Sequence, residues 1–363
     1  MQSASSLSHT GRPTTADAAN ANVDPLIRDY DNLFRLFYNY PPTLNSVNIA
    51  SAYTECKSLL ALADMYDALS VTAPRVDHHL LGFGSRLFKQ ISKYPPSYLK
   101  LGYLARSRVI FTEALIHVVG QWPAALPNLR NGSYPPIPNS VLDLVEDKFE
   151  DLEDLKARVE SKLFRLSLTT SRGERVNPNN AYLEWLAVSL FRQWLIDSTT
   201  PPPPPILKNS PNSPSIPPIP PPNTVISHGR TVSRPQDLLP STVDLQTTTT
   251  TATSSSSNSS PSTPSSPAQV YRLIGSYSTQ AYLPHDELKK FLKLHPTSSS
   301  DCLYTRDVLK RFERRMDEIK RLAREIVKPL MRNFLELDRA GDARVGRLPY
   351  LTCTRVEEGD LPW

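Results

Sequence analysis

The sequence predicts a mainly α-helical protein, in which a helical bundle is followed by a long disordered linker and a C-terminal helix. Apolar residues recur at steps of three and four through most of the chain, as one buried helix face requires. We find no succession of alternating strand patterns and no internal repeat. Proline is abundant, with 35 prolines against 12 glycines in 363 residues, and much of it falls in one tract without aromatic residues.

The first helices are expected between about residues 25 and 123. A helix with Ser46 as its N-cap is followed by a second helix that begins at Pro74, and a third begins at Pro95. A further helix ends at Pro123. The apolar positions that define the buried faces of the first two helices are Ile49, Tyr53, Cys56, Leu60 and Ala63, then Val76, Leu80, Phe83, Leu87 and Ile91.

Two longer helices follow between residues 141 and 196. The first has acids in its first half and bases in its second, an order that favours the helix dipole. Its predicted buried side consists of Leu142, Val145, Phe149, Leu152, Val159, Leu163 and Leu166. The second, AYLEWLAVSLFRQWLID, is apolar almost all round, which predicts burial between neighbouring helices.

Composition divides the chain into four parts: a disordered tail over 1–24, a helical region over 25–197, a linker over 198–268 and a C-terminal segment over 269–363. The linker contains the proline tracts Pro201 to Pro205 and Pro217 to Pro222, which favour polyproline II. Such tracts either act as spacers or dock in aromatic grooves of the SH3 or WW type.

Beyond the linker, a long helix is expected from about residue 306, ending near Val327 because Pro329 cannot continue it. We expect this helix to pack back on the helical body through its apolar face. Tyr350 to Val356 form a short β-like run that either pairs or packs. The predicted apolar face consists of Val308, Phe312, Met316, Ile319, Leu322, Ile326 and Leu330.

Charge and cysteine content bound the class of protein. The formal net charge is +5 and the sequence pI is about 9.0, a mildly basic balance that is neither a nucleic-acid nor a membrane signature by itself. Cys56, Cys302 and Cys353 lie far apart and form no disulfide or zinc pattern. With no signal-peptide or membrane-length apolar run, we expect an intracellular protein of the cytoplasm, the nucleus or both.

The stretch VDHHLLGFGSR, residues 76–86, superficially resembles a metal or phosphate site. Adjacent helix residues point about 100° apart, so His78 and His79 cannot share a ligand face. No strand precedes Gly82 and Gly84, as a phosphate loop would require, and Ser85 has no base partner. We therefore expect packing here, with no metal, cofactor or catalytic residues. A metal-dependent enzyme is only the third hypothesis.

A second hypothesis concerns the strongly basic face of the helix at 306–332. Its cations match phosphates on nucleic acid, which would make the chain a nuclear nucleic-acid-associated regulator. Acids are interleaved with them, so an ordinary ion-paired helix surface is the alternative. The candidate patch consists of Lys310, Arg311, Arg314, Arg315, Lys320, Arg321 and Arg324.

The segments YDNLFRLFYNYPPTL, IASAYTECKSLLALADMYDAL and PRVDHHLLGFGSRLFKQISKYPPSYLKLGYLARSRVIFTEALIHVVGQWP together resemble a group of fungal BTB/POZ-domain proteins. The resemblance is close over about 25–123, and YLTCT and LPW near the C-terminus are similar to the end of the same proteins. It implies a non-enzymatic adaptor that binds protein partners, such as a cullin-type ubiquitin ligase or transcriptional regulators.

The N-terminal half of a BTB domain, with its strands, has no counterpart before Tyr30. This predicts a truncated or diverged BTB form that lacks the family's dimer interface and part of its cullin-docking surface. We expect apolar and aromatic side chains on the remaining helices to contact partners. These candidate interaction residues are Leu33, Phe37, Tyr38, Met65, Tyr66, Phe312, Met316 and Ile319.

Overall fold

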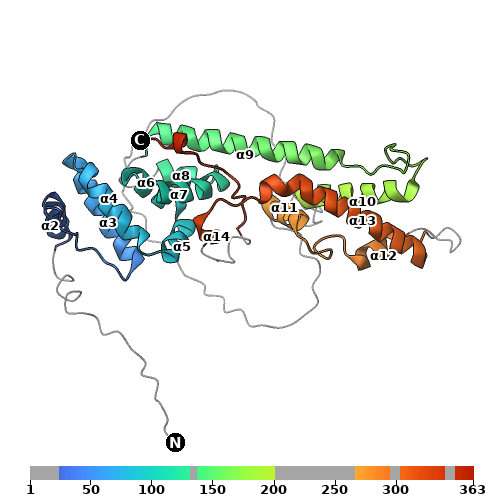
Figure 1. Ribbon diagram of the computed structural model, residues 1–363, viewed down its shortest axis with the longest axis horizontal. Helices are drawn as coiled ribbons and strands as arrows, with labels where there is room; N and C mark the ends of the chain where they lie inside the picture. The colour runs from blue at the N-terminus through green and yellow to red at the C-terminus, as the bar shows by residue number, and fades with distance from the viewer. Residues whose placement is uncertain (1–23, 131–136, 201–265, 295–302, 340–347) are drawn as a thin grey trace, which may run out of the picture. The chain divides into compact units, whose positions relative to one another are not determined.

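The computed structural model describes residues 24–130, 137–200, 266–294, 303–339 and 348–363 (Figure 1). The described residues are mainly α-helical, which confirms the predicted fold class, and the one β-type pairing among them is an isolated bridge between Thr169 and Arg175. The helices up to residue 130 are α2 (Pro25–Phe37), α3 (Ile49–Met65), α4 (Leu69–Leu81), α5 (Ser85–Lys93), α6 (Pro95–Leu104), α7 (Arg108–Gly120) and α8 (Leu126–Arg130). Those that follow are α9 (Asn139–Arg165), α10 (Tyr182–Thr199), α11 (Pro267–Gly275), α12 (His285–Lys293), α13 (Arg306–Val327), η1 (Lys328–Met331), α14 (Glu336–Arg339) and η3 (Glu358–Asp360).

Caps and turns correct three of the predicted helix boundaries. The N-cap of α3 is Asn48, whose side chain accepts the Ala50 amide, so the prediction of Ser46 is wrong. Pro74 lies inside α4 and does not begin it. The predicted helix over 74–91 is in fact two helices, because Gly84 takes φ +54° between α4 and α5.

Glycines inside a helical pattern favour close approach of another backbone, but Gly82 and Gly84 do not provide it. A Cβ built at Gly84 would meet nothing within 4 Å, and one at Gly82 would meet only carbonyl oxygens of its own helix, the nearer at 3.2 Å. Two helices do approach closely at Gly102 of α6, where a Cβ would stand 2.8 Å from the Phe111 backbone nitrogen. Gly102 therefore allows α6 and α7 to pack backbone to backbone.

The periodic faces of α3, α4, α5 and α9 are buried largely as predicted. Val76, Leu80, Leu87 and Ile91 have no exposed surface, although the Gly84 turn interrupts their helix. α10 departs from the prediction of all-round burial. One face, with Phe191 at its centre, is buried, while the remaining apolar side chains are half-buried or exposed.

The C-terminal helices pack on the helical body, as predicted. α13 contacts α9, α10, α11 and α12, and Figure 1 shows α10, α11 and α13 side by side. The buried face is shifted from the predicted one, because Leu309 and Ala323 are buried while Val308, Leu322 and Ile326 are only partly buried. The helix ends at Val327, as Pro329 predicts.

The predicted tail over 1–24 and the predicted linker lie almost entirely outside the described residues. The linker boundaries at 198 and 268 are wrong by a few residues, because α10 continues to Thr199 and α11 begins at Pro267. Both proline tracts and Cys302 also lie outside the described residues.

The C-terminal residues form an extended segment that packs on the helices and is not a strand. Leu351, Thr352, Cys353 and Thr354 are buried. Shortly before these residues, the carbonyls of Leu348 and Tyr350 accept hydrogen bonds from the Arg272 guanidinium. At the chain end, the Trp363 ring lies against Phe111, with ring centroids 5.2 Å apart.

Candidate protein-interaction surface

The buried face of α2 is unusual because half of it is polar. Asp29 and Asn32 are as buried as Leu33 and Leu36. The Ser58 hydroxyl donates to Asp29, and Asn32 exchanges hydrogen bonds with the backbone of Thr43 at 2.7 and 3.2 Å. Because each polar group has a partner, this face is a specific, satisfied contact with the rest of the fold.

The opposite face of α2 is apolar and mostly exposed, and Tyr30 on it is half-buried against the core. Ile27, Tyr30, Phe34, Phe37 and Tyr38 are spaced by three or four residues, so they form a stripe of about 100° on the helix. Ile27, Phe34 and Tyr38 are 62%, 56% and 76% exposed. An amphipathic helix would normally bury such a stripe, and here the stripe faces outward.

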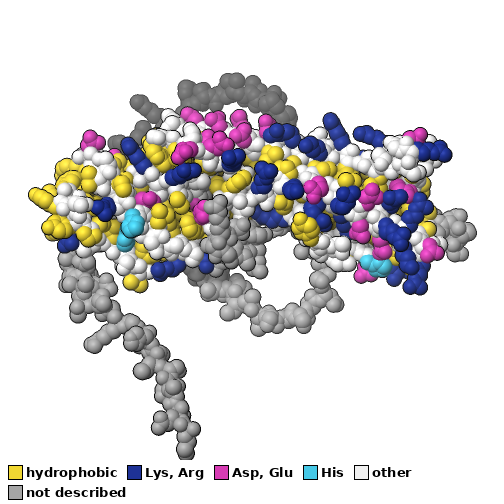
Figure 2. All heavy atoms as spheres, viewed as in Figure 1, with side chains coloured by type: hydrophobic (Ala, Val, Ile, Leu, Met, Phe, Trp, Pro, Cys, Tyr) yellow, Lys and Arg dark blue, Asp and Glu magenta, His cyan; other side chains and the backbone are white. Residues whose placement is uncertain are grey.

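The end of α3 extends this stripe. The Tyr66 hydroxyl lies 3.0 Å from that of Tyr30, with their rings edge to face, and Met65 is 77% exposed. We call Ile27, Tyr30, Phe34, Phe37, Tyr38, Met65 and Tyr66 the aromatic surface. In Figure 2, hydrophobic side chains gather over α2 and α3 at the left end of the view.

Exposed apolar side chains are concentrated at this place. The described part of the chain has 17 exposed large hydrophobic residues, and eight of them belong to α2, the turn after it or the end of α3. Scattered exposed apolar residues are ordinary on a protein surface, whereas a contiguous group is typical of a binding site.

The structure separates the predicted interaction residues into two groups. Phe37, Tyr38, Met65 and Tyr66 are exposed, as contact with a partner requires. The other four are at most 2% exposed and belong to the hydrophobic core, so predicting them as interaction residues is wrong: Leu33, Phe312, Met316 and Ile319. These four side chains are buried because they lie on the inward faces of α2 and α13.

The sequence prediction missed Ile27, Tyr30 and Phe34. The signal was present in the segment PLIRDYDNLFRLFY, which contains two apolar series on opposite sides of one helix. The series with Leu33 and Leu36 faces the core. The three missed residues belong to the other series.

The predicted basic patch on α13 does not face solvent as a unit. Arg311 and Arg315 contact the buried Glu184 carboxylate of α10, at 2.7 and 3.5 Å. Burial alone would raise the pKa of Glu184, but the hydrogen bond from Arg311 and both positive charges lower it, so it is the charged partner of these arginines.

Two further cations of the patch bind the backbone of the segment between α11 and α12. Lys320 is 5% exposed and donates to the carbonyls of Thr279 and Leu283 at 2.7 and 3.0 Å, and burial lowers its pKa. Arg324 donates to the Ser276 carbonyl at 3.1 Å. Four members of the patch are exposed, and three of them, Lys310, Arg314 and Arg321, are held by neither Glu184 nor these carbonyls.

The Asp77 to His79 stretch has structural contacts. The His79 Nε2 atom lies 2.9 Å from the Asn45 carbonyl, to which it donates, and the ring packs edge to face on Phe83. Asp77 accepts the Ser107 hydroxyl, and Ser107 is the N-cap of α7. Among the described residues, no three His, Cys, Asp or Glu side chains gather closely enough to hold a metal ion.

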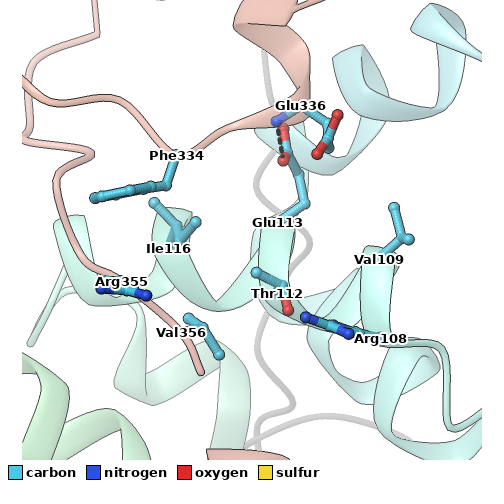
Figure 3. A pocket seen from close by; sticks show the side chains of 9 residues that line it. All are labelled: Arg108, Val109, Thr112, Glu113, Ile116, Phe334, Glu336, Arg355 and Val356. Carbon is cyan, nitrogen blue, oxygen red and sulfur yellow. Dashed lines mark hydrogen bonds between the residues drawn. The ribbon is translucent and has the colours of Figure 1, made fainter. Parts of the chain in front are cut away.

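A pocket of about 260 Å³ lies beside α7, where the C-terminal residues pack (Figure 3). Its buried carboxylate, Glu113, accepts the backbone amides of Glu336 and Leu337 at 2.7 and 3.1 Å. The guanidinium groups of Arg108 and Arg355 line the pocket, and each also lies 3.2 to 3.5 Å from a nearby glutamate. Both Glu113 oxygens therefore anchor the start of α14, so they hold the C-terminal segment on α7.

His117 lies one turn after Glu113 and is fully buried. Its Nδ1 atom is 2.9 Å from the Tyr350 hydroxyl, and Nε2 has no hydrogen-bond partner in the part of the chain that the structure describes. Burial lowers the pKa of His117 to about 4, so the ring is neutral at pH 7. The 4.0 Å approach to Glu113 is therefore not an ion pair at that pH.

No family model, curated protein or solved structure matches this chain. None of the helices in the described ranges has both the length and the apolar character needed to cross a membrane.

Proposed function

We propose that this chain is a non-enzymatic protein-interaction adaptor of the BTB type, and that the aromatic surface is where a partner protein docks. The observation that carries the proposal is the outward apolar stripe of α2, opposite a buried face whose polar groups are satisfied. Because the inward face is already complete, turning α2 over to bury the stripe would break hydrogen bonds. The stripe is thus available for a second protein.

The chemistry of the surface favours a partner that presents an amphipathic helix. Residues spaced by three and four along α2 form a ridge into which the side chains of another helix can interdigitate. Tyrosine and phenylalanine bury large areas at small cost in side-chain entropy, and aromatic residues are enriched in binding hot spots. Cullin-type ubiquitin ligases and transcriptional regulators are the partner classes that the BTB resemblance suggests.

Affinity purification of the tagged chain from its own cells tests the proposal. The double variant Phe34→Ser/Tyr38→Ser removes two exposed rings, and Phe164→Ser on α9 is the control, because Phe164 is 49% exposed and lies outside the aromatic surface. We expect reproducible partners to be lost from the double variant and retained by the control. Retention of the same partners by both variants would contradict the proposal.

The nucleic-acid hypothesis remains the second candidate, with less support. Three exposed cations of the predicted patch are held by neither Glu184 nor backbone carbonyls, so duplex binding through this helix would neutralise about three phosphates. The logarithm of the binding constant would then fall with the logarithm of salt concentration with a slope of about −3. A steeper slope would mean that other cations bind the duplex, and a flat slope would exclude the phosphate mechanism.

A further inference from the structure

A stripe of carboxylates runs along the outer face of α9, opposite the buried face of that helix. Its members recur at steps of three and four residues, so they share one side of the helix. Figure 2 shows acidic side chains gathered over the first half of α9, at the top of the view. We call the following exposed residues the acidic stripe: Asp143, Glu146, Asp147, Glu150, Asp151 and Asp154.

The acidic stripe is not neutralised by its own helix. Carboxylates four residues apart on it, such as Glu146 and Glu150, repel each other and destabilise the helix. The two lysines within the same span lie off the stripe, and both are engaged. Lys148 contacts Asp360 at 2.8 Å, and Lys156 contacts Glu153 at 3.1 Å. A cationic ligand on the stripe would therefore relieve repulsion between its carboxylates.

A pocket of about 270 Å³ lies where the acidic stripe meets the C-terminal segment. α9 contributes the Asp151 carboxylate and the apolar side chains of Leu152 and Leu155, and the C-terminal segment contributes Thr354. The stripe thus leads to a concave site that has both a charged and an apolar wall.

Two groups that line this pocket are unsatisfied. The Asp151 carboxylate makes no hydrogen bond or ion pair with another described residue. Thr354 is 6% exposed, and its hydroxyl also has no hydrogen-bond partner in the described ranges. The other charged side chains of the lining, Lys148, Arg355 and Glu357, are paired. A buried hydroxyl without a partner is uncommon in a folded protein, so the pocket favours a ligand that brings hydrogen-bond donors.

An arginine side chain has the shape and the donors that this pocket requires. Its guanidinium carries five N–H groups, enough to bind the Asp151 carboxylate through two of them and donate to the Thr354 hydroxyl through another. Its methylene stem can pack on Leu152 and Leu155. We propose that an arginine-rich segment of a partner protein binds here, with one arginine in the pocket and its neighbours along the acidic stripe. This site is separate from the aromatic surface of α2 and α3.

Fluorescence anisotropy with labelled octaarginine and the full chain tests this inference, and octalysine of equal charge is the second probe. We expect both peptides to bind more weakly as salt rises, because exposed charges are screened. Octaarginine should bind about fivefold more tightly, since an ammonium group cannot contact a carboxylate bidentately. Equal affinities would overturn the arginine pocket. Absence of octaarginine binding, or binding that is insensitive to salt, would overturn the whole assignment.

Two single substitutions test the pocket. Asp151→Asn should weaken octaarginine binding by about tenfold and octalysine binding by less, because it removes the bidentate contact. Thr354→Val keeps the shape of the side chain and should weaken octaarginine binding by about threefold. Its melting temperature should not fall, because the hydroxyl has no partner to lose. Unchanged octaarginine binding by both variants would contradict the pocket assignment.

A pair of double variants tests the acidic stripe. Glu146→Gln/Glu150→Gln removes two charges from the stripe, and Asp286→Asn/Glu287→Gln removes two exposed charges from α12 as the matched control. We expect the stripe variant to weaken binding of both peptides by about fivefold and the control to change it by less than about twofold. Equal weakening by the two variants would show that the peptides respond to net charge, which would overturn the assignment to α9.

Discussion

Acidification should destabilise this protein through the buried imidazole of His117. The pKa of His117 is lowered by burial to about 4, whereas an unfolded chain has its ordinary value of 6.5. Between these two values the unfolded state binds a proton that the folded state does not, so stability falls as the pH falls. The difference between the two pKa values corresponds to about 3 kcal/mol of folding stability. This stability is fully present above pH 6.5 and is lost by about pH 4.

Urea unfolding of the wild-type chain and His117→Gln at several pH values between 7.5 and 4 measures this contribution. The variant carries a constant offset from lost packing, which the comparison across pH removes. We expect the difference in unfolding free energy, wild type minus variant, to fall by about 3 kcal/mol over the range. A difference that stays constant with pH would show that His117 titrates alike in both states, which would refute the reasoning from burial.

Three further predictions concern stability. Gly102→Ala should cost about 1–3 kcal/mol in chemical unfolding, because its Cβ would meet the backbone of α7, while Gly359→Ala should be near neutral because a Cβ there meets nothing within 4 Å. Lys320→Met should cost roughly 2–4 kcal/mol by leaving two buried carbonyls without their donor, and the exposed Lys310→Met should change stability by less than about 0.5 kcal/mol. Glu113→Gln should weaken the attachment of α14 by about 1–2 kcal/mol, seen as faster proteolysis of the C-terminal segment; unchanged digestion would contradict the anchoring role.

Most of the helices could be predicted because burial of one face imposes a period of 3.6 residues on the sequence. The buried series in α4 and α5 was recognised in this way, yet the break between them was not. The periodicity of Val76 to Ile91 continues across the turn, since the positive φ of Gly84 redirects the chain without interrupting the apolar spacing. Hydrophobic pattern alone cannot report such a turn.

The polar contacts were harder to predict because they join residues far apart in sequence. Helical spacing places Lys320 beside Met316 and Ala323 on the inward side of α13, but it does not reveal the carbonyls of the segment before α12 to which Lys320 donates. The same holds for Glu113 and its contact with α14, 223 residues away along the chain. Sequence identified the charged groups, and only the tertiary fold determines which of them face solvent.

Photo-crosslinking from the aromatic surface tests the central claim most directly. Benzoylphenylalanine placed at position 34 of the full chain in its own cells reacts with whatever protein covers α2, and the same probe at position 164 serves as the control. We predict discrete adducts with the same partners at position 34 that are absent at position 164. No adduct at position 34, or the same adducts at both positions, would contradict the assignment of this surface as the docking site.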